Sequence, residues 1–335
     1  MQTHLNCCSP PLFLWATKSM DYSRLLLSAA GILLFCSSIS CTGDRSFSQQ
    51  GANIVQKSVI QVGTLPDGLI DEASGIAPSM LYEDILWTLN DSGNEPNLFA
   101  IRADGTLITT VAVDGIENRD WEDLASFERE NRSYLLIADV GDNPNRRKTC
   151  SLFIVEEPDI YGKNSSANVS RHIQFEYEDG PRDCESVAID QTNMKILLLT
   201  KRDFPPRLYE LPLEPASDHM PLQARFLGEV TSLYRLQESK PSRSRLNQRE
   251  LQPTAMDIDK KGSAAVVLTY KKVYLFLRLE GETWQDTFKR LPAELELPAI
   301  RQAEAICFSG EARSIFVTSE KSDAPILKMD WEISR

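Results

Sequence analysis

The sequence predicts an all-β fold built from five similar units, on three observations. A short motif led by a carboxylate or hydroxyl recurs at intervals of about 50 to 70 residues, the length of a four-stranded propeller blade with its loops. Its copies are Glu72–Ile76, Glu122–Ser126, Glu185–Ile189, Thr254–Ile258 and Glu304–Phe308. Two further apolar runs follow each copy, and one unassigned run, Ser58–Leu65, precedes them all. We therefore expect a five-bladed β-propeller, with six blades as the alternative.

Each unit reads as an antiparallel meander, because short runs rich in β-branched and aromatic residues between turn-forming residues are typical of strands. The predicted second strands are Ile85–Leu89, Tyr134–Ala138, Lys195–Thr200, Ala264–Thr269 and Ser314–Thr318. The predicted third strands are Leu98–Ile101, Ser151–Val155, Arg207–Leu211, Val273–Leu277 and Ile326–Met329. We interpret Gln237–Gln252 as a long surface loop, or alternatively as a lid over one face of the ring.

The last unit has too little chain after Met329 for a complete outer strand. A propeller avoids an exposed edge by pairing its last blade with its first. We therefore expect the run Ser58–Leu65 to complete the fifth blade and close the ring.

The first 40 residues are predicted to be a signal peptide region, outside the ring. The apolar run Leu25–Phe35 follows Arg24, precedes small residues and is too short to span a bilayer. Met20 stands where a signal peptide should start. The alternative is an N-terminal anchor that is not cleaved.

Ser38–Cys41 resembles the cleavage box of bacterial lipoproteins, which makes Cys41 the expected lipidation site. Ser38 departs from that pattern, which usually has Leu there. Residues 41–57 are interpreted as a tether and 58–335 as the propeller domain. These features predict an exported protein of the cell envelope that meets the membrane only through its lipid, with secretion after ordinary cleavage as the alternative.

Charge and residue counts exclude several functions. The formal net charge is −12, which argues against a nucleic-acid partner because phosphate binding needs a basic face. Past Cys41 only Cys150, Cys184 and Cys307 remain, without a C-x-x-C pair, so neither a disulfide framework nor a thiolate zinc site is indicated. Few histidines remain for a Ser-His-Asp centre. We expect a monomer.

The start of each first strand and the end of each second strand should meet at one mouth of the ring, because the two strands are antiparallel neighbours. The residues expected to ring the axis there are Glu72, Glu122, Glu185, Thr254 and Glu304. Those expected around them include Asn90, Asp91, Asp142, Asn143, Lys201, Tyr270 and Glu320. This mouth is the predicted functional face.

Converging glutamates predict a bound cation. Two carboxylates about 5 Å apart repel by about 3 kcal/mol at an effective dielectric near 20, a sizeable part of a domain's stability. Ligands that are all oxygen favour Ca²⁺, and Mg²⁺ less because it needs a small octahedral site. Arg119, Arg182 and Arg301 each lie three residues before a glutamate. They are expected either to pair with nearby carboxylates or to bind an anionic ligand.

Several motifs together resemble a family of exported bacterial propeller proteins with no assigned function. These motifs are Glu72–Gly75, Asn90–Gly93, Asp120–Asp123, Asp139–Asn143 and Glu156–Pro158. The five-unit layout is more loosely similar to the calcium-activated nucleotidases (apyrases), five-bladed propellers with one axial Ca²⁺. That resemblance implies ligands at Glu122, Glu185 and Glu304, a serine equivalent at Thr254, and either Glu72 or Ser74 in the first unit. A weaker likeness is to the phytase-like propellers, which usually have six blades.

Two functions follow as hypotheses. In the first, the polar mouth binds Ca²⁺ together with an anionic small molecule or an envelope protein, and the metal makes the ring rigid. In the second, Ca²⁺ polarises a phosphoryl oxygen, with Asp120 or Asp142 as the base and the three arginines neutralising charge. The binding hypothesis is preferred slightly.

Overall fold

The computed structural model describes residues 53–162, 165–215 and 221–334. The predicted signal peptide, Cys41 and most of the tether lie outside these residues. Regular structure in the described part is almost entirely β, as the sequence predicts. No helix in these residues is long and apolar enough to cross a membrane.

The strands form five antiparallel meanders. The first is β2 (Ala73–Pro78), β3 (Ile85–Asn90), β4 (Asn97–Arg102) and β5 (Leu107–Asp114). The second is β6 (Trp121–Arg129), β7 (Arg132–Asp139), β8 (Cys150–Glu156) and β9 (Ser166–Tyr177). The third is β10 (Cys184–Asp190), β11 (Lys195–Thr200), β12 (Arg207–Pro212) and β13 (Leu222–Glu229). The fourth is β14 (Pro253–Ile258), β15 (Ala264–Thr269), β16 (Lys272–Leu277) and β17 (Ala293–Glu296).

The fifth meander combines both ends of the described chain. It contains β18 (Ala303–Phe308), β19 (Ser314–Ser319) and β20 (Pro325–Ser334), and its outer strand is β1 (Asn53–Thr64). Strand β1 pairs antiparallel with β20, from Asn53 opposite Ser334 to Thr64 opposite Pro325. The N-terminal strand therefore covers the edge that β20 would otherwise expose.

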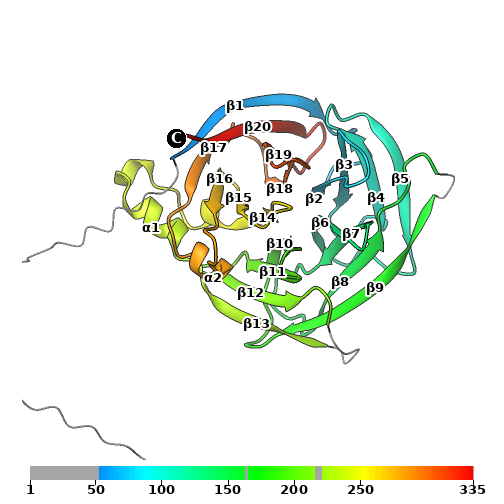
Figure 1. Cartoon of the computed structure of the whole chain (residues 1–335), viewed down its shortest axis with the longest axis horizontal. Coiled ribbons are helices and arrows are strands. Elements are labelled where there is room, and N and C mark those ends of the chain that lie inside the picture. The colour runs from blue at the N-terminus through cyan, green and yellow to red at the C-terminus, as the bar shows by residue number, and fades with distance from the viewer. Residues whose placement is uncertain (1–52, 163–164, 216–220, 335) are drawn as a thin grey trace, which may run out of the picture. The chain divides into compact units, whose positions relative to one another are not determined.

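The meanders lie around a common axis with β2, β6, β10, β14 and β18 innermost, which is the arrangement of a β-propeller (Figure 1). Apolar side chains fill the spaces between the meanders in five clusters, each joining two neighbours. The cluster between the first and last meanders, for example, contains Ile76, Phe99 and Ile326. Cys150, Cys184 and Cys307 are free and buried among these side chains.

The outer strands are not all joined alike. Strand β9 pairs in parallel with β5 and β13, so the first three meanders form one twelve-stranded sheet. The fourth and fifth meanders are separate four-stranded sheets. Between them, the Gln56 side chain of β1 donates to the carbonyl of Glu296 in β17 (2.9 Å) and accepts from its N–H (2.8 Å). A side chain thus replaces strand pairing at that boundary.

The segment interpreted from the sequence as a loop is partly helical. It includes the end of α1 (Ser232–Glu238) and the 3-10 turns η1 (Ser242–Ser244) and η2 (Arg249–Leu251). Another short helix, α2 (Trp284–Thr287), lies outside this segment. Gln237 donates to the Tyr274 hydroxyl (3.1 Å), and Lys240 pairs with Glu294 (2.5 Å). The segment therefore packs on the outer strands of the fourth meander, and Figure 1 shows α1 far from the axis.

One carboxylate connects three inner strands at the axis. Asp123 of β6 is fully buried; its Oδ1 accepts from its neighbour Leu124 N (2.9 Å), and its Oδ2 accepts from Val187 N of β10 (2.7 Å) and Met256 N of β14 (3.3 Å). An inner strand has no partner strand on its axial side, so its N–H groups there need other acceptors. Asp123 supplies such an acceptor to two other meanders.

We expect Asp123→Asn to destabilise the protein. An amide offers one oxygen instead of two, so either Leu124 N or the Val187 and Met256 donors lose their acceptor, at about 1–3 kcal/mol for each buried donor. Urea unfolding followed by tryptophan fluorescence measures the change. Glu83→Gln, at an exposed position, is the control. Equal midpoints for both variants would contradict a bracing role for Asp123.

Candidate functional site

Each innermost strand carries one β-bulge near its start. In every pairing with the second strand one residue is skipped: Ser74, Glu122, Glu185, Thr254 and Glu304. We call these five the bulge residues. A bulge re-aims a side chain and ends regular pairing, which suits a site at the end of a strand. In the first meander the equivalent position belongs to Ser74, while Glu72 lies two residues earlier and is exposed.

The two hydroxyl bulge residues hold neighbouring meanders together. Ser74 Oγ donates to the carbonyl of Trp121, and Thr254 Oγ1 donates to the carbonyl of Ala303, both at 2.7 Å. Trp121 and Ala303 each directly precede the glutamate of the next meander. These hydrogen bonds therefore fix the strand starts from which Glu122 and Glu304 project.

The carboxylates at this end of the axis form what we call the acidic mouth: Asp91, Asp120, Glu122, Glu185, Glu304 and Glu320. Within it, Asp91, Asp120 and Glu122 each offer an oxygen within 4.8 Å of the other two. No other group of three Asp, Glu, His or Cys residues in the described ranges meets that criterion. Burial, and then the neighbouring Glu185 carboxylate, raises the pKa of Glu122 well above its usual value.

Asp91 and Asp120 come from the polar segments at the strand ends. Burial raises the pKa of Asp91 to about 6, although the Ser92 N–H donates to its carboxylate and opposes the shift. Burial also raises the pKa of Asp120. Asn118 fixes this corner, because its Nδ2 donates to the carbonyls of Asn90 (2.9 Å) and Asp91 (2.8 Å).

Lys201 is the buried ammonium group of the mouth, and the more exposed Lys321 lies 3.5 Å from Glu320. Lys201 forms an ion pair with Glu185 and lies 5.2 Å from the centre of the Tyr270 ring. Burial alone would lower the pKa of Lys201, but the carboxylates of Glu185 and Glu304 outweigh it and raise that pKa above its usual value. Lys201 therefore stays charged at neutral pH beside Glu185, whose pKa burial raises to about 8 although Lys201 opposes the shift.

Glu304 and Glu320 form a second close pair, joined by a side-chain hydrogen bond. Burial, and then this contact with Glu304, raises the pKa of Glu320 to about 8. Gln302 Nε2 also donates to Glu320 (2.5 Å). Of the predicted axial glutamates, Glu304 belongs to this pair, Glu185 to the ion pair with Lys201, and Glu122 to the cluster with Asp91 and Asp120. Glu72 belongs to none of these groups and accepts from Asn94 (2.7 Å).

The turn after β7 forms a wall of the mouth. A Cβ atom built on Gly141 would lie 2.2 Å from Glu122 Oε1 and 2.5 Å from Asp120 Oδ2, so only glycine lets the backbone approach these oxygens. Asp142, predicted as a base, instead accepts the N–H of Arg147 (2.6 Å) inside the same turn. The Asp142 N–H donates to Asp183 (2.9 Å) of the third meander.

The other predicted ligand-binding residues lie near this end of the ring but not among the clustered carboxylates. Arg119 and Arg301 are exposed, and Arg182 pairs with Asp179 (3.1 Å) and Asp203 (3.3 Å). Asn143 is exposed and accepts from Arg202. Asn90 is buried and donates to the Leu69 carbonyl (2.9 Å).

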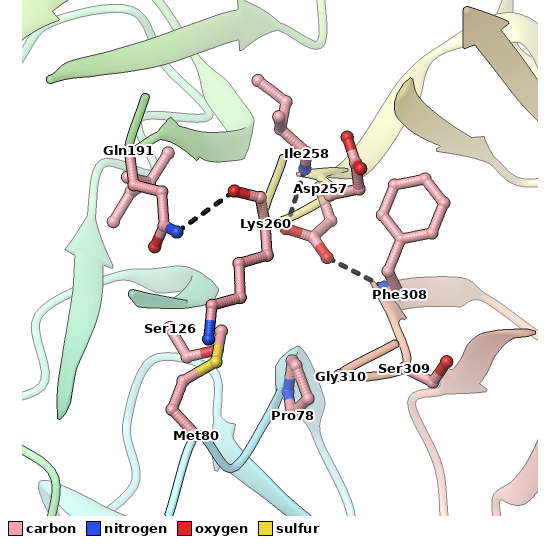
Figure 2. A pocket seen from close by; sticks show the side chains of 12 residues that line it. Pro78, Met80, Ser126, Gln191, Asp257, Ile258, Lys260, Phe308, Ser309 and Gly310 are labelled. Carbon is pink, nitrogen blue, oxygen red and sulfur yellow. Dashed lines mark hydrogen bonds between the residues drawn. The ribbon is translucent and has the colours of Figure 1, made fainter. Parts of the chain in front are cut away.

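The far end of the axis is narrow and has different chemistry. The last residues of β2, β14 and β18 help to line a cavity of about 20 Å³, which is room for one water molecule (Figure 2). There Asp257 accepts the N–H groups of Ile258 and Phe308, both at 2.8 Å. Burial raises the pKa of Asp257 to about 7. Asp123 lies between the two ends, where its carboxylate connects β6 with β10 and β14.

Comparison with known proteins does not assign the chain to a family. No family model matches it, and no curated protein does. Among solved structures, it is similar to a gluconolactonase from Xanthomonas campestris, with 11% identity, a TM-score of 0.43, and coverage of 82% of this chain and 89% of that one. It is also similar to the WD40 repeats of RRP9, with 11% identity, a TM-score of 0.38 and coverage of 78% and 67%. At these scores no binding site or activity carries over, and the resemblance to exported bacterial lipoproteins stays a prediction.

The raised pKa values predict that, without divalent cations, stability falls as pH rises. For Asp91 and Glu320 the protonated form is favoured by folding, so the stability it contributes is present at low pH and is lost as pH passes about 6 and about 8, respectively. We expect the melting temperature in EDTA to decline between about pH 5 and pH 9. Glu320→Gln should make the upper part of that decline smaller, because Glu185, whose pKa is also raised to about 8, still contributes there, whereas the exposed Glu311→Gln should leave the decline unchanged. A melting temperature that rises over this range would contradict the interpretation.

Proposed function

We propose that the chain is an exported, lipid-anchored, five-bladed β-propeller that binds Ca²⁺ at its acidic mouth, and that the surrounding polar face binds an anionic small molecule or an envelope protein. The single observation that carries the metal proposal is the convergence of Asp91, Asp120 and Glu122 on one point. The pairing of β1 with β20 and the five apolar clusters between meanders support a closed ring of five blades rather than six.

The geometry of the three carboxylates suits a calcium ion. Ca²⁺ takes oxygen ligands at about 2.3–2.6 Å, so two ligands on opposite sides of the ion are about 5 Å apart. Oxygens that lie within 4.8 Å of one another can therefore all contact one Ca²⁺. Gly141 adds no side chain beside two of these ligands, Glu122 and Asp120. The ligands are all oxygen, which favours Ca²⁺ over zinc or copper, with Mg²⁺ as a weaker fit.

Charge supports the same proposal. Among the described residues, the six carboxylates of the mouth have two ammonium partners, and both are already engaged, Lys201 with Glu185 and Lys321 with Glu320 (3.5 Å). A divalent cation near Asp91, Asp120 and Glu122 would replace mutual repulsion with attraction. The bound ion would then offer any open coordination position to an oxygen of an anionic ligand, which is the basis of the binding function.

Calcium-dependent hydrolysis of phosphoesters or phosphoanhydrides is the alternative. Asp142 is engaged inside its own turn, so Asp120 is the remaining base among the two carboxylates predicted for that role. Asp120 is also a proposed metal ligand, and a ligand carboxylate is a poor base because the metal holds its lone pairs. The binding function is therefore preferred.

We expect Ca²⁺ to stabilise the purified protein and EDTA to reverse the effect. A ligand that binds only the folded state at about 100 times its Kd adds about 2.7 kcal/mol to the free energy of unfolding. Glu122→Gln should abolish the calcium-dependent rise in melting temperature. Glu157→Gln is the matched control, because Glu157 is also a buried glutamate but binds Ser79, Met80 and Trp87 away from the mouth.

Glu157→Gln should lower the melting temperature and keep the response to Ca²⁺. The exposed Glu72→Gln should keep it too if the first meander contributes Asp91 instead of Glu72. The absence of any shift in the unaltered protein, with no bound metal by elemental analysis, would refute the metal proposal.

We expect no phosphate release from nucleoside di- or triphosphates or from phytate in the presence of Ca²⁺. Release that EDTA and Asp120→Asn both abolish would instead support the hydrolase. The measurement is a phosphate assay under conditions in which calcium binding has been demonstrated, so that inactivity cannot come from an empty site.

A further inference from the structure

One buried arginine supports the wall of the acidic mouth. Arg147 lies in the segment between β7 and β8, with its side chain 8% exposed, and it pairs with Asp139, whose side chain is 4% exposed, at 2.6 Å. The same guanidinium also donates to the Gly141 carbonyl (2.8 Å) and the Asp139 carbonyl (3.2 Å). The planar fork of one arginine thus reaches three acceptors in a turn of three residues.

The held turn is the one against which the carboxylates lie. Gly141 is the residue whose backbone approaches Glu122 and Asp120 so closely that no Cβ would fit, and its N–H donates to the Asp120 carbonyl (3.2 Å). The backbone N–H of Arg147 also closes the turn by donating to Asp142. Arg147 therefore holds this turn through the carbonyls of Asp139 and Gly141 and through the Asp139 carboxylate.

We infer that Arg147 is a positioning residue of the acidic mouth, one that fixes the turn 139–142 so that Asp120 and Glu122 are held ready for a cation. This inference rests on the proposed calcium function. It assigns to Arg147 the supporting role for which the sequence suggested Arg119, Arg182 and Arg301. Arg119 and Arg301 are exposed. Arg182 pairs with Asp179 and Asp203.

Arg147→Lys tests the inference because lysine keeps the charge but cannot form the fork. Isothermal titration with CaCl₂, at a temperature where circular dichroism shows every variant folded, should give at least a tenfold weaker Kd than that of the unaltered protein. The matched control is Arg278→Lys. Arg278 also pairs with a buried carboxylate, that of Asp190 (3.0 Å), but at the last residue of β10, the far end of that strand.

A purely structural role would lower the melting temperature of both variants and leave the calcium Kd of both unchanged, and that result would overturn the inference. An equal loss of affinity in the two variants would overturn it too. If the unaltered protein binds no Ca²⁺, the calcium proposal itself fails. If the unaltered protein and Arg147→Lys bind Ca²⁺ equally well, the calcium proposal stands and only the inference about Arg147 fails.

Hydrogen exchange on the unaltered protein keeps the inference testable if Arg147→Lys does not fold. Residues 139–142 should already exchange slowly in EDTA, because the guanidinium and not the metal holds the turn. Fast exchange in EDTA that becomes slow only with Ca²⁺ would overturn the inference.

Discussion

The unpaired axial edge of the inner strands is the constraint on which the rest of this structure depends. Five strands meet around the axis, and each has a partner strand on its outer side only. Backbone donors that point inward must therefore find acceptors that are not strands. Asp123 does this for β10 and β14, and Asp257 does it for β18. The other four copies of the motif have small residues at the position of Asp123, namely Gly75, Ser186, Ala255 and Ala305, which leaves its carboxylate room at the axis.

The β-bulges direct acidic side chains toward one end of the axis. At the start of each inner strand one residue leaves the ladder, and in three of the five meanders that residue is a glutamate. The two hydroxyl bulge residues act as spacers that tie their meander to the next. The result concentrates acidic groups at one end, while the other end narrows to a cavity the size of a water molecule. Ion pairing by Lys201 and support from Arg147 organise these groups without neutralising all of them.

Local strand signals were readable in the sequence because apolar alternation and turn residues are local properties. The runs Lys195–Thr200 and Ala264–Thr269 coincide with β11 and β15. The choice between Glu72 and Ser74 was not readable, since a bulge changes the alternation and both residues lie at a strand start. The roles of Asp123 and Arg147 could not be predicted from the repeat. Asp123 differs from the residues at the same position in the other copies of the motif, and Arg147 lies in a segment that the other units do not repeat. Their roles arise from contacts between segments far apart in the chain or from the shape of one turn.

Because the outer strands are joined differently around the axis, some boundaries between meanders should resist separation more than others. Three meanders share a continuous ladder, whereas the fourth and fifth touch at their rims through the amide of Gln56. Two hydrogen bonds from one side chain yield more easily than a row of backbone pairs. Within the described residues, the boundaries between the third and fourth and between the fifth and first meanders also lack paired outer strands. A force that spreads the meanders apart would therefore act on these three boundaries before it separated the first three meanders from one another.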